Sequence, residues 1–301
     1  PILNLIALYM GYASIGLAVS SLVATILFRV IYYLFVSRKL NIRPIFAKPS
    51  IPLVKDILTF SFWVFVSNIV SHLYVTTDTV LMGAIPTLAI AGVAVYSVGE
   101  IMSSMIFTIN GGISSLLIPK ANKMVFEGAN NDEITNMAIR MGRIQCLIIS
   151  IVIFGFIAFG PPFIHFYVGD EYKDAYWVAV VVMLPNMVPL VQSFCLNILM
   201  ARNKNKFRAL VYLGIAIVNV IGTWYLLHSW GIIGAAVMTG LSLLIGNGFI
   251  MNWYYQRKLG LDMWRFWKSI GRLVVLPMTM SAITLFLYKV IDFYNLYYYL
   301  H

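Results

Sequence analysis

Three ionisable residues, Arg29, Asp78 and Glu100, interrupt long apolar stretches of the sequence. An ionisable side chain inside a membrane is costly, so it usually lines a wet cavity or pairs with another polar group. Each residue is therefore a candidate for contact with a charged substrate or for proton transfer. Their neighbours on the helix surface decide which role is open to each.

Glu100 lies about eleven residues into its apolar stretch, near mid-membrane at the rise of an α-helix. Three- and four-residue steps from Glu100 give a continuous small and polar stripe: Tyr96, Ser97, Ser103, Ser104, Gly111, Ser114 and Ser115. The stripe predicts a cavity wall, with a small-residue packing seam between helices as the alternative. Glu100 is the better candidate, over Asp78, for a deep proton relay.

Asp78 belongs to a broad polar sector of its helix: Ser61, Ser67, Asn68, Ser71, His72, Tyr74 and Thr79. A sector this broad predicts contact with a cavity, so Asn68, His72 and Asp78 are candidate lining residues. His72 could titrate or simply be hydrogen-bonded. Asp78 lies about 22 residues, or about 33 Å, beyond Asp56. It is therefore either a polar element at the outer end of the cavity or a nearly solvated acid at a helix end.

Arg29 lies in the inner third of its span, with Thr25, Tyr32 and Tyr33 on its side of the helix. One interpretation is a long side chain that reaches the cytoplasmic interface without further function. The other is an anion contact, because a guanidinium group suits phosphate.

The stretch "MLPNMVPL" places Pro185 and Pro189 near the middle of another span. Each proline removes a backbone donor and predicts a kink. Asn186, Ser193 and Asn197 then line one face, so Asn186 and Asn197 are further candidates for substrate contact. Broken helices often mark transporter binding sites, although proline is also common in ordinary membrane helices.

Motifs for catalysis are absent from the sequence: it has no histidine pair at metal spacing, phosphate loop or nucleophile elbow. We therefore expect no enzymatic activity, no cofactor and no metal site. Cys146 and Cys195 lie in apolar stretches without motif spacing and are interpreted as small core residues.

The composition indicates the elements that must position these residues. Of 301 residues, 61% are hydrophobic and 11% are charged, and the mean hydropathy is +0.87. Apolar runs of about 20 residues recur, which predicts an all-α, polytopic membrane protein. We expect eight complete spans, at 12–36, 57–82, 89–118, 141–163, 174–200, 209–228, 232–256 and 272–291. The first residues, apolar from Pro1, are interpreted as the end of an earlier span, so the sequence is expected to be a fragment.

Basic residues concentrate in alternate linkers between these spans. Segments 37–55, 119–143, 201–208 and 257–272 hold 18 of the 21 basic residues, and the intervening linkers are neutral or acidic. The net charge of +10 therefore indicates membrane topology rather than nucleic-acid binding. The basic linkers are expected in the cytoplasm, and residues 292–301 outside.

A short repeat relates two parts of the chain. "IGLAVSS" (15–21), followed by "SRKL" (37–40), resembles "IGAAVMT" (233–239), followed by "QRKL" (256–259). Equivalent spans of the same orientation indicate a parallel repeat of two helix bundles, as in many transporters.

Several segments, in the right order, resemble the bacterial polysaccharide or O-antigen flippases of the multidrug/oligosaccharidyl-lipid/polysaccharide exporter superfamily. They are "VKDILTFSFWVFVSNIVSHLYVTTDTVLMG" (54–83), "AGVAVYSVGEIMSSM" (91–105), "SSLLIPKANKM" (114–124), "GDEYKDA" (169–175) and "VNVIGTWYLLHSWGIIGAAVMTG" (218–240). The resemblance implies two lobes of six helices. On it, residues 1–36 end the N-terminal lobe, 37–55 form a cytoplasmic linker, 56–256 form the C-terminal lobe, and 257–301 add one helix and an outer tail.

The resemblance also implies a function. Such proteins move an undecaprenyl-pyrophosphate-linked oligosaccharide across the bacterial inner membrane by alternating access, for lipopolysaccharide and similar surface glycans. Arg29, the only basic residue that the predicted spans place deep in the membrane, becomes the candidate pyrophosphate contact. The expected partners are this lipid-linked oligosaccharide, the bilayer and polysaccharide-assembly proteins, and no nucleic acid.

Two other functions remain open on the sequence. A multidrug or toxin exporter of the same superfamily would couple cation uptake to efflux through Asp78 and Glu100. A membrane-embedded glycan polymerase or acyltransferase would need clustered Arg, His or Asp in a sizeable outer loop, and the predicted outer linkers are too small for it.

Overall fold

The computed structural model describes residues 13–39, 50–86, 88 and 90–291, and their regular structure is entirely helical. The predicted all-α fold class is confirmed. The chain divides into two compact units, residues 1–55 and 56–301. The predicted lobe limits stay predictions.

The first unit contains one long described helix, α2 (Ala13–Lys39). Large apolar side chains cover it without burial: Phe28 is 74% exposed and Tyr32 is 69% exposed. In water this surface would be strongly unfavourable, whereas hydrocarbon accepts it. The helix ends on Arg38 and Lys39, which suit the polar edge of a membrane.

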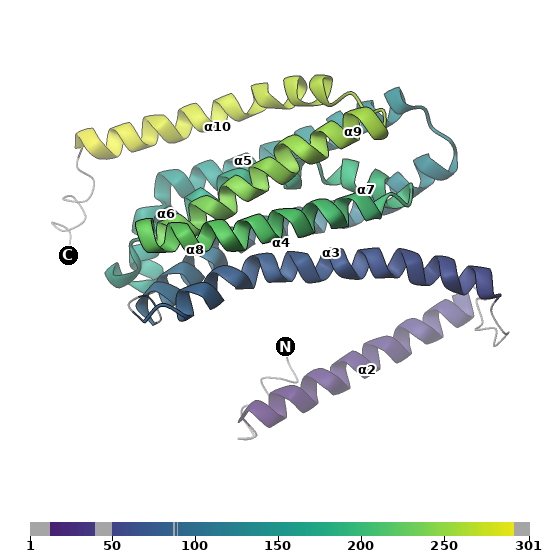
Figure 1. Cartoon of the computed structure of the whole chain (residues 1–301), viewed down its shortest axis with the longest axis horizontal. Helices are drawn as coiled ribbons and strands as arrows, with labels where there is room; N and C mark the ends of the chain where they lie inside the picture. Colours follow the sequence, from purple (N-terminus) through teal and green to yellow (C-terminus); the bar gives the residue numbers. More distant parts are fainter. Residues whose placement is uncertain (1–12, 40–49, 87, 89, 292–301) are drawn as a thin grey trace. The chain divides into compact units, whose positions relative to one another are not determined.

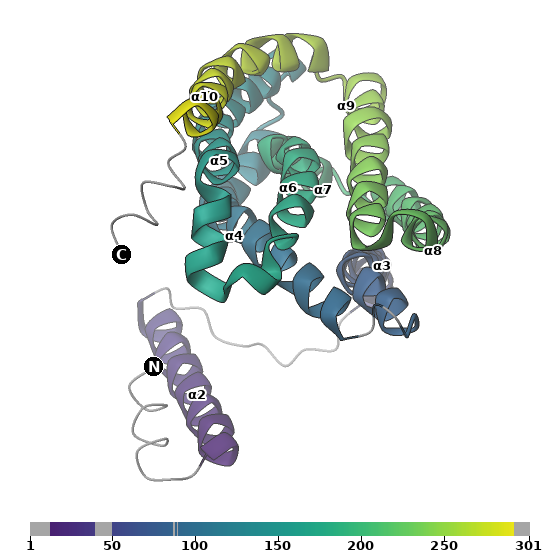
Figure 2. The ribbon, with the colours of Figure 1, turned by 90° about the vertical axis from the view of Figure 1, so that its left-hand side faces the viewer.

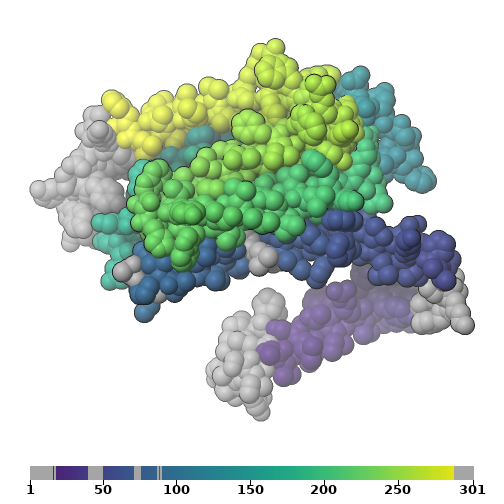
Figure 3. Space-filling view, viewed as in Figure 1, coloured from purple at the N-terminus to yellow at the C-terminus, as the bar shows by residue number. Residues whose placement is uncertain are grey.

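The second unit is a bundle of long helices. It begins with α3 (Ile51–Gly83), whose first turn belongs to the first unit. The elements that follow are α4 (Ala91–Phe126), α5 (Asn131–Val168), η1 (Asp170–Tyr172), α6 (Ala175–Val191), α7 (Ser193–Ala201), α8 (Asn205–Leu243), η2 (Leu244–Met251), α9 (Asn252–Lys258) and α10 (Met263–Ile291). The helix α10 lies along α5, and α6 packs against α4, α5 and α8 (Figures 1 and 2). On the face shown in Figure 3, α8 and α9 form a continuous green surface.

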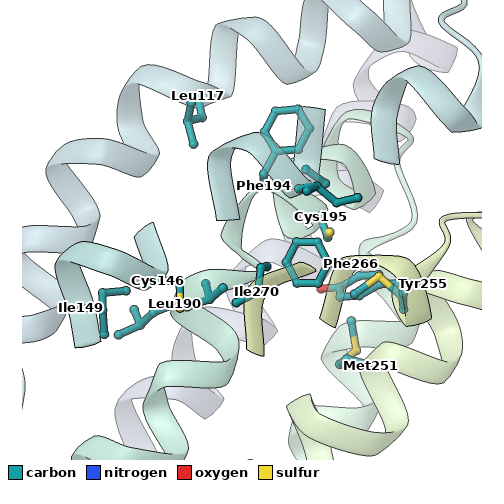
Figure 4. Close-up of a cluster of buried hydrophobic side chains, with 14 of the residues drawn as sticks. Leu117, Cys146, Ile149, Leu190, Phe194, Cys195, Met251, Tyr255, Phe266 and Ile270 are labelled. Carbon is teal, nitrogen blue, oxygen red and sulfur yellow. The ribbon is translucent and has the colours of Figure 1, made fainter. Parts of the chain in front are cut away.

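The main apolar core of the bundle joins α4–α7, the π-helix η2, α9 and α10. Cys146 of α5, Phe194 of α7 and Phe266 of α10 are among its buried side chains (Figure 4). Gly142 lets α5 and α10 approach, because an added Cβ would lie 2.8 Å from the Ile270 Cδ1 atom. Cys195 is also in this core, as the sequence predicted for both cysteines.

Each of the eight predicted spans falls on a helical run of the structure. By length and composition, the described residues hold six helices able to cross a membrane, or seven if the bent pair α6–α7 counts as one span. The longest candidate, Asn205–Lys258, contains two predicted spans. Gly231 divides it with φ 58° and ψ −143°, a conformation that glycine adopts with least strain.

The linkers predicted at 119–143 and 257–272 are much shorter in the structure. Helix α4 continues to Phe126, and α5 begins at Asn131. Helix α5 begins at this point because its first turn is capped. The Asn130 side chain accepts a hydrogen bond of 2.8 Å from the Glu133 amide, a donor that has no partner within the helix. At the other linker, α10 already begins at Met263.

The prolines do not mark the break in the span 174–200. Helix α6 runs through Pro185 and Pro189, and the bend of 47° follows at Gln192, between α6 and α7. The Gln192 side chain donates to the Asn247 carbonyl at 3.1 Å, so the break is tied to the π-helix η2. The predicted kink is therefore present but displaced from both prolines.

Candidate functional site

A cavity of about 520 Å³ opens within the second unit, between α3, α4, α6, α7, α8 and η2. Its polar lining residues come from four stretches of the chain: Glu100, Ser103, Ser104, Asn110, Ser114, Asn186, Ser193, Asn197, Arg208, Tyr212, Thr239, Ser242 and Asn247. A cavity of this volume is in the range of small-molecule sites.

The α4 wall is the small and polar stripe that surrounds Glu100 in the sequence. Ser103, Ser104, Gly111 and Ser114 all line the cavity with Glu100. The Ser103 hydroxyl donates to the Glu100 backbone carbonyl at 3.2 Å, a bond that does not involve the Glu100 carboxyl group. Part of the stripe therefore borders the cavity, and part of it packs against neighbouring helices, since Ser114 also donates to Ser193 of α7 and Tyr96 is buried in a core cluster.

The opposite wall comes from α6 and α7. Asn186 is buried and donates from Nδ2 to the Val182 carbonyl at 2.9 Å, so its amide oxygen is not used by this bond. The Nδ2 atom of Asn197 is buried without a hydrogen-bond partner among the described residues. The bend at Gln192 separates the two asparagines, and both line the same cavity as Glu100.

Gln145 of α5 is the centre of a hydrogen-bonded cluster with Asn110, Ser114 and Ser193, here called the polar floor. Its Nε2 atom donates to Ser193 Oγ at 2.6 Å and to Asn110 Oδ1 at 3.0 Å, and Ser114 Oγ donates to Ser193 Oγ at 3.0 Å. The Oε1 atom of Gln145 has no described partner. The sequence interpretation did not select Gln145, although a glutamine within an apolar span is itself a signal.

Arg208 is a cavity-lining basic residue that the sequence interpretation did not select. The sequence assigned Arg208 to a linker, but α8 begins at Asn205, so Arg208 lies in its first turn and lines the cavity. Its guanidinium carbon lies 4.7 Å from the centre of the Tyr212 ring, within range of a cation–π contact. Its Nε atom is buried with no hydrogen-bond partner in the described part of the chain.

Asp78 is the centre of a second polar assembly, between α3, α4 and α8. Its side chain is 1% exposed and accepts hydrogen bonds from the Tyr96 hydroxyl, from Thr239 at 2.6 Å and from Thr223 at 3.3 Å. Asn219 donates from Nδ2 to Thr239 Oγ1 at 3.2 Å. The interpretation of Asp78 as a nearly solvated acid is therefore wrong, because three helices enclose it.

Thr239 connects this assembly to the cavity, since it contacts Asp78 and also lines the cavity. The partners of Asp78 lie 18, 145 and 161 residues away in the sequence. The sequence pattern on α3 alone therefore could not identify them.

The remaining candidates lie elsewhere. Arg29 is exposed on α2 in the first unit, and Asn68 is exposed on α3. The His72 side chain lies outside the described residues. Of the seven candidates, the structure brings Glu100, Asn186 and Asn197 into one cavity and joins Asp78 to it through Thr239.

Comparison with known proteins places the chain in a family. Residues 2–177 match the family described as "Polysaccharide biosynthesis protein", which is more than half of the chain. The chain belongs to this polysaccharide biosynthesis family. Comparison with curated proteins gave no match.

The fold of this family member is similar to a solved MOP superfamily transporter from Pyrococcus furiosus Vc1 (DSM3638), for which a binding pocket of reverse polarity was taken to suggest a different function. The TM-score is 0.51 at 18% sequence identity, and the match covers 75% of this chain and 52% of the other. The likeness shows the fold, and the chain spans about half the length of that transporter. It is a multi-pass membrane protein of MOP transporter fold.

Proposed function

We propose that this chain is part of a transporter that moves a polyprenyl-pyrophosphate-linked oligosaccharide across the bacterial cytoplasmic membrane for the synthesis of surface polysaccharide such as O-antigen. The observation that carries the proposal is a cavity of about 520 Å³ inside a bundle of apolar helices, with amide, hydroxyl and guanidinium groups set in a mainly apolar wall, in a polysaccharide biosynthesis family member. A glycan and a pyrophosphate cannot cross hydrocarbon unaided, so a carrier must offer them polar groups.

The lining supplies both kinds of group. Amides and hydroxyls of Asn186, Asn197 and Ser193 can donate to and accept from sugar hydroxyls. Arg208 offers a guanidinium group whose buried Nε atom has no hydrogen-bond partner among the described residues, which suits a pyrophosphate oxygen. The lipid tail stays outside the bundle, in the bilayer.

Transport further requires that the cavity open alternately to the two sides of the membrane. In this proposal residues 56–256 form one lobe, which rocks against an N-terminal lobe to which α2 belongs. Arg29 of α2 is a second candidate for the pyrophosphate, contributed by that lobe. The basic linkers face the cytoplasm, as the positive-inside rule favours.

The proposal is tested by deletion of the complete gene, followed by complementation. We expect the deletion to leave lipid-linked oligosaccharide in the inner leaflet, and Arg208→Ala or Arg29→Ala to restore export poorly although the protein inserts normally. Arg257→Ala, which removes an exposed charge at the end of α9, is the matched control and should complement fully. Full export by both Arg208→Ala and Arg29→Ala would contradict the assigned contacts.

A second candidate function is cation-coupled export of drugs or toxins. The Asp78 assembly favours it, because a buried carboxyl group joined to the cavity through Thr239 could transmit protonation or cation binding to the cavity wall. Normal surface glycan together with increased drug sensitivity in the deletion strain would favour this exporter over the flippase.

A further inference from the structure

A second hollow lies on the outside of the bundle, where α5 and α10 meet. It has a volume of about 530 Å³, and its lining includes three arginines, Arg140, Arg143 and Arg265, together with Asn136 and Ser269. No carboxylate is among its described lining residues. Three guanidinium groups that line one hollow repel one another, so the arrangement favours an anion among them.

Hydrogen bonds join the two helices beside the hollow. The Arg265 guanidinium donates to Asn136 Oδ1 at 2.8 Å, and the Asp262 amide donates to Thr135 Oγ1 at 3.2 Å, so α10 is joined to α5 twice at its first turn. Gly142 allows close packing beneath the hollow, where an added Cβ would meet Phe266 at 2.9 Å. The site is therefore built from two elements rather than from one exposed helix face.

Apolar surface continues from the hollow along both helices. On α5, Leu147 and Ile151 follow Arg140 by 7 and 11 residues on the same face, and they are 40% and 63% exposed. On α10, Leu276 follows Arg265 by 11 residues and is 70% exposed. A ligand that fits both surfaces has an anionic head and an apolar tail.

We propose that this hollow binds the phosphate-bearing headgroup of an anionic membrane phospholipid, whose acyl chains lie along α5 and α10. Basic pockets between membrane helices recognise such headgroups through charge and guanidinium–phosphate hydrogen bonds. The bound lipid would hold α10 against α5 by neutralising the charges that converge at their contact. The site is separate from the transport cavity and does not depend on the proposed function.

The experiment is a titration of the full chain, purified in a neutral detergent, with phosphatidylglycerol by native mass spectrometry. Because each basic residue near an anionic lipid contributes about a fivefold factor in binding, Arg140→Ala, Arg143→Ala and Arg265→Ala together should weaken binding roughly a hundredfold. The matched control removes three exposed charges elsewhere, Lys120, Arg257 and Lys258, and should bind as the wild type does.

Four further arms make the outcome decisive. Phosphatidylcholine should bind much more weakly than phosphatidylglycerol, and Arg208→Ala in the transport cavity should leave phosphatidylglycerol binding unchanged. If the triple alanine variant does not fold, the single substitution Arg143→Glu tests the same charge at an exposed position. Two results would overturn the proposal. One is equal phosphatidylglycerol binding by the wild type and by the hollow variant that is measured, either the triple alanine variant or Arg143→Glu. The other is displacement of the lipid by equimolar glycerol phosphate.

Discussion

The hydrogen bond between Tyr96 and Asp78 should couple α4 to α3. Both side chains are buried, at 0% and 1% exposure, and the Tyr96 hydroxyl donates directly to the Asp78 carboxyl group. The perturbations are Tyr96→Phe, Asp78→Ala and the two together. A double-mutant cycle isolates their coupling, because each single change removes the bond without adding a group.

The magnitude follows from the partners that each change leaves. Hydrogen bonds between membrane helices couple by about 0.6 kcal/mol on average and by up to about 1.7 kcal/mol. We expect about 1.5 kcal/mol here, because the acceptor is a carboxyl group and the bond is fully buried. Asp78→Ala alone should cost about 3 kcal/mol, since the hydroxyls of Tyr96, Thr223 and Thr239 all lose an acceptor, although Asn219 compensates for part of this loss.

The assay is the free energy of unfolding in bicelles, measured for all four proteins of the cycle. Tyr225→Phe is the matched control, because Tyr225 lies on α8 with 70% of its surface exposed, and its coupling to Asp78→Ala should be near zero. A coupling between Tyr96 and Asp78 no larger than that of the control would refute the reasoning.

Three more substitutions test the packing, each by the free energy of unfolding in the same bicelles. Gly231→Ala should lower the free energy of unfolding by about 1–3 kcal/mol because of the positive φ at Gly231. Gly214→Ala, in open space within α8, should raise it by about 0.5 kcal/mol. Equal effects of the two substitutions would contradict the break at Gly231. Gly142→Val should cost about 1–3 kcal/mol, because the added side chain would collide with α10. Gly155→Val, with open space around it, should cost less. The reverse order would contradict the close packing of α5 against α10. Gln145→Leu should cost about 1–3 kcal/mol, because it removes the donor to Asn110 Oδ1 and one of the two donors to Ser193 Oγ. An unchanged stability would show that the polar floor contributes nothing.

The helical architecture could be predicted because apolar length is a strong signal. A run of about 20 apolar residues has few alternatives to a membrane helix. The break at Gly231 was also visible, as the short linker between 228 and 232. Helix ends were predicted less well: Asn130 and Glu133 form an N-cap pattern that extends α5 toward its N-terminus, and hydropathy alone does not detect it.

The candidate site was only partly predictable, because it depends on contacts between distant helices. Glu100, Asn186 and Asn197 each lie on a polar face of their own helix, and such faces can be read from spacing. The depth estimate for Asp78 took account of its position along α3 but not of α8, which covers it. Arg208 was missed because its basic neighbours made the whole segment resemble a linker.

The most direct test of the proposed function is lipid translocation in vesicles that contain the complete protein. A labelled polyprenyl-pyrophosphate oligosaccharide is placed in one leaflet, and its appearance in the other is followed with an added glycosidase that cannot cross the membrane. We predict translocation by the wild-type protein, and a rate at least tenfold lower for Arg208→Ala, the change expected from loss of one charged hydrogen bond of about 1.5–3 kcal/mol. Glycan movement no faster than in protein-free vesicles would contradict the central claim.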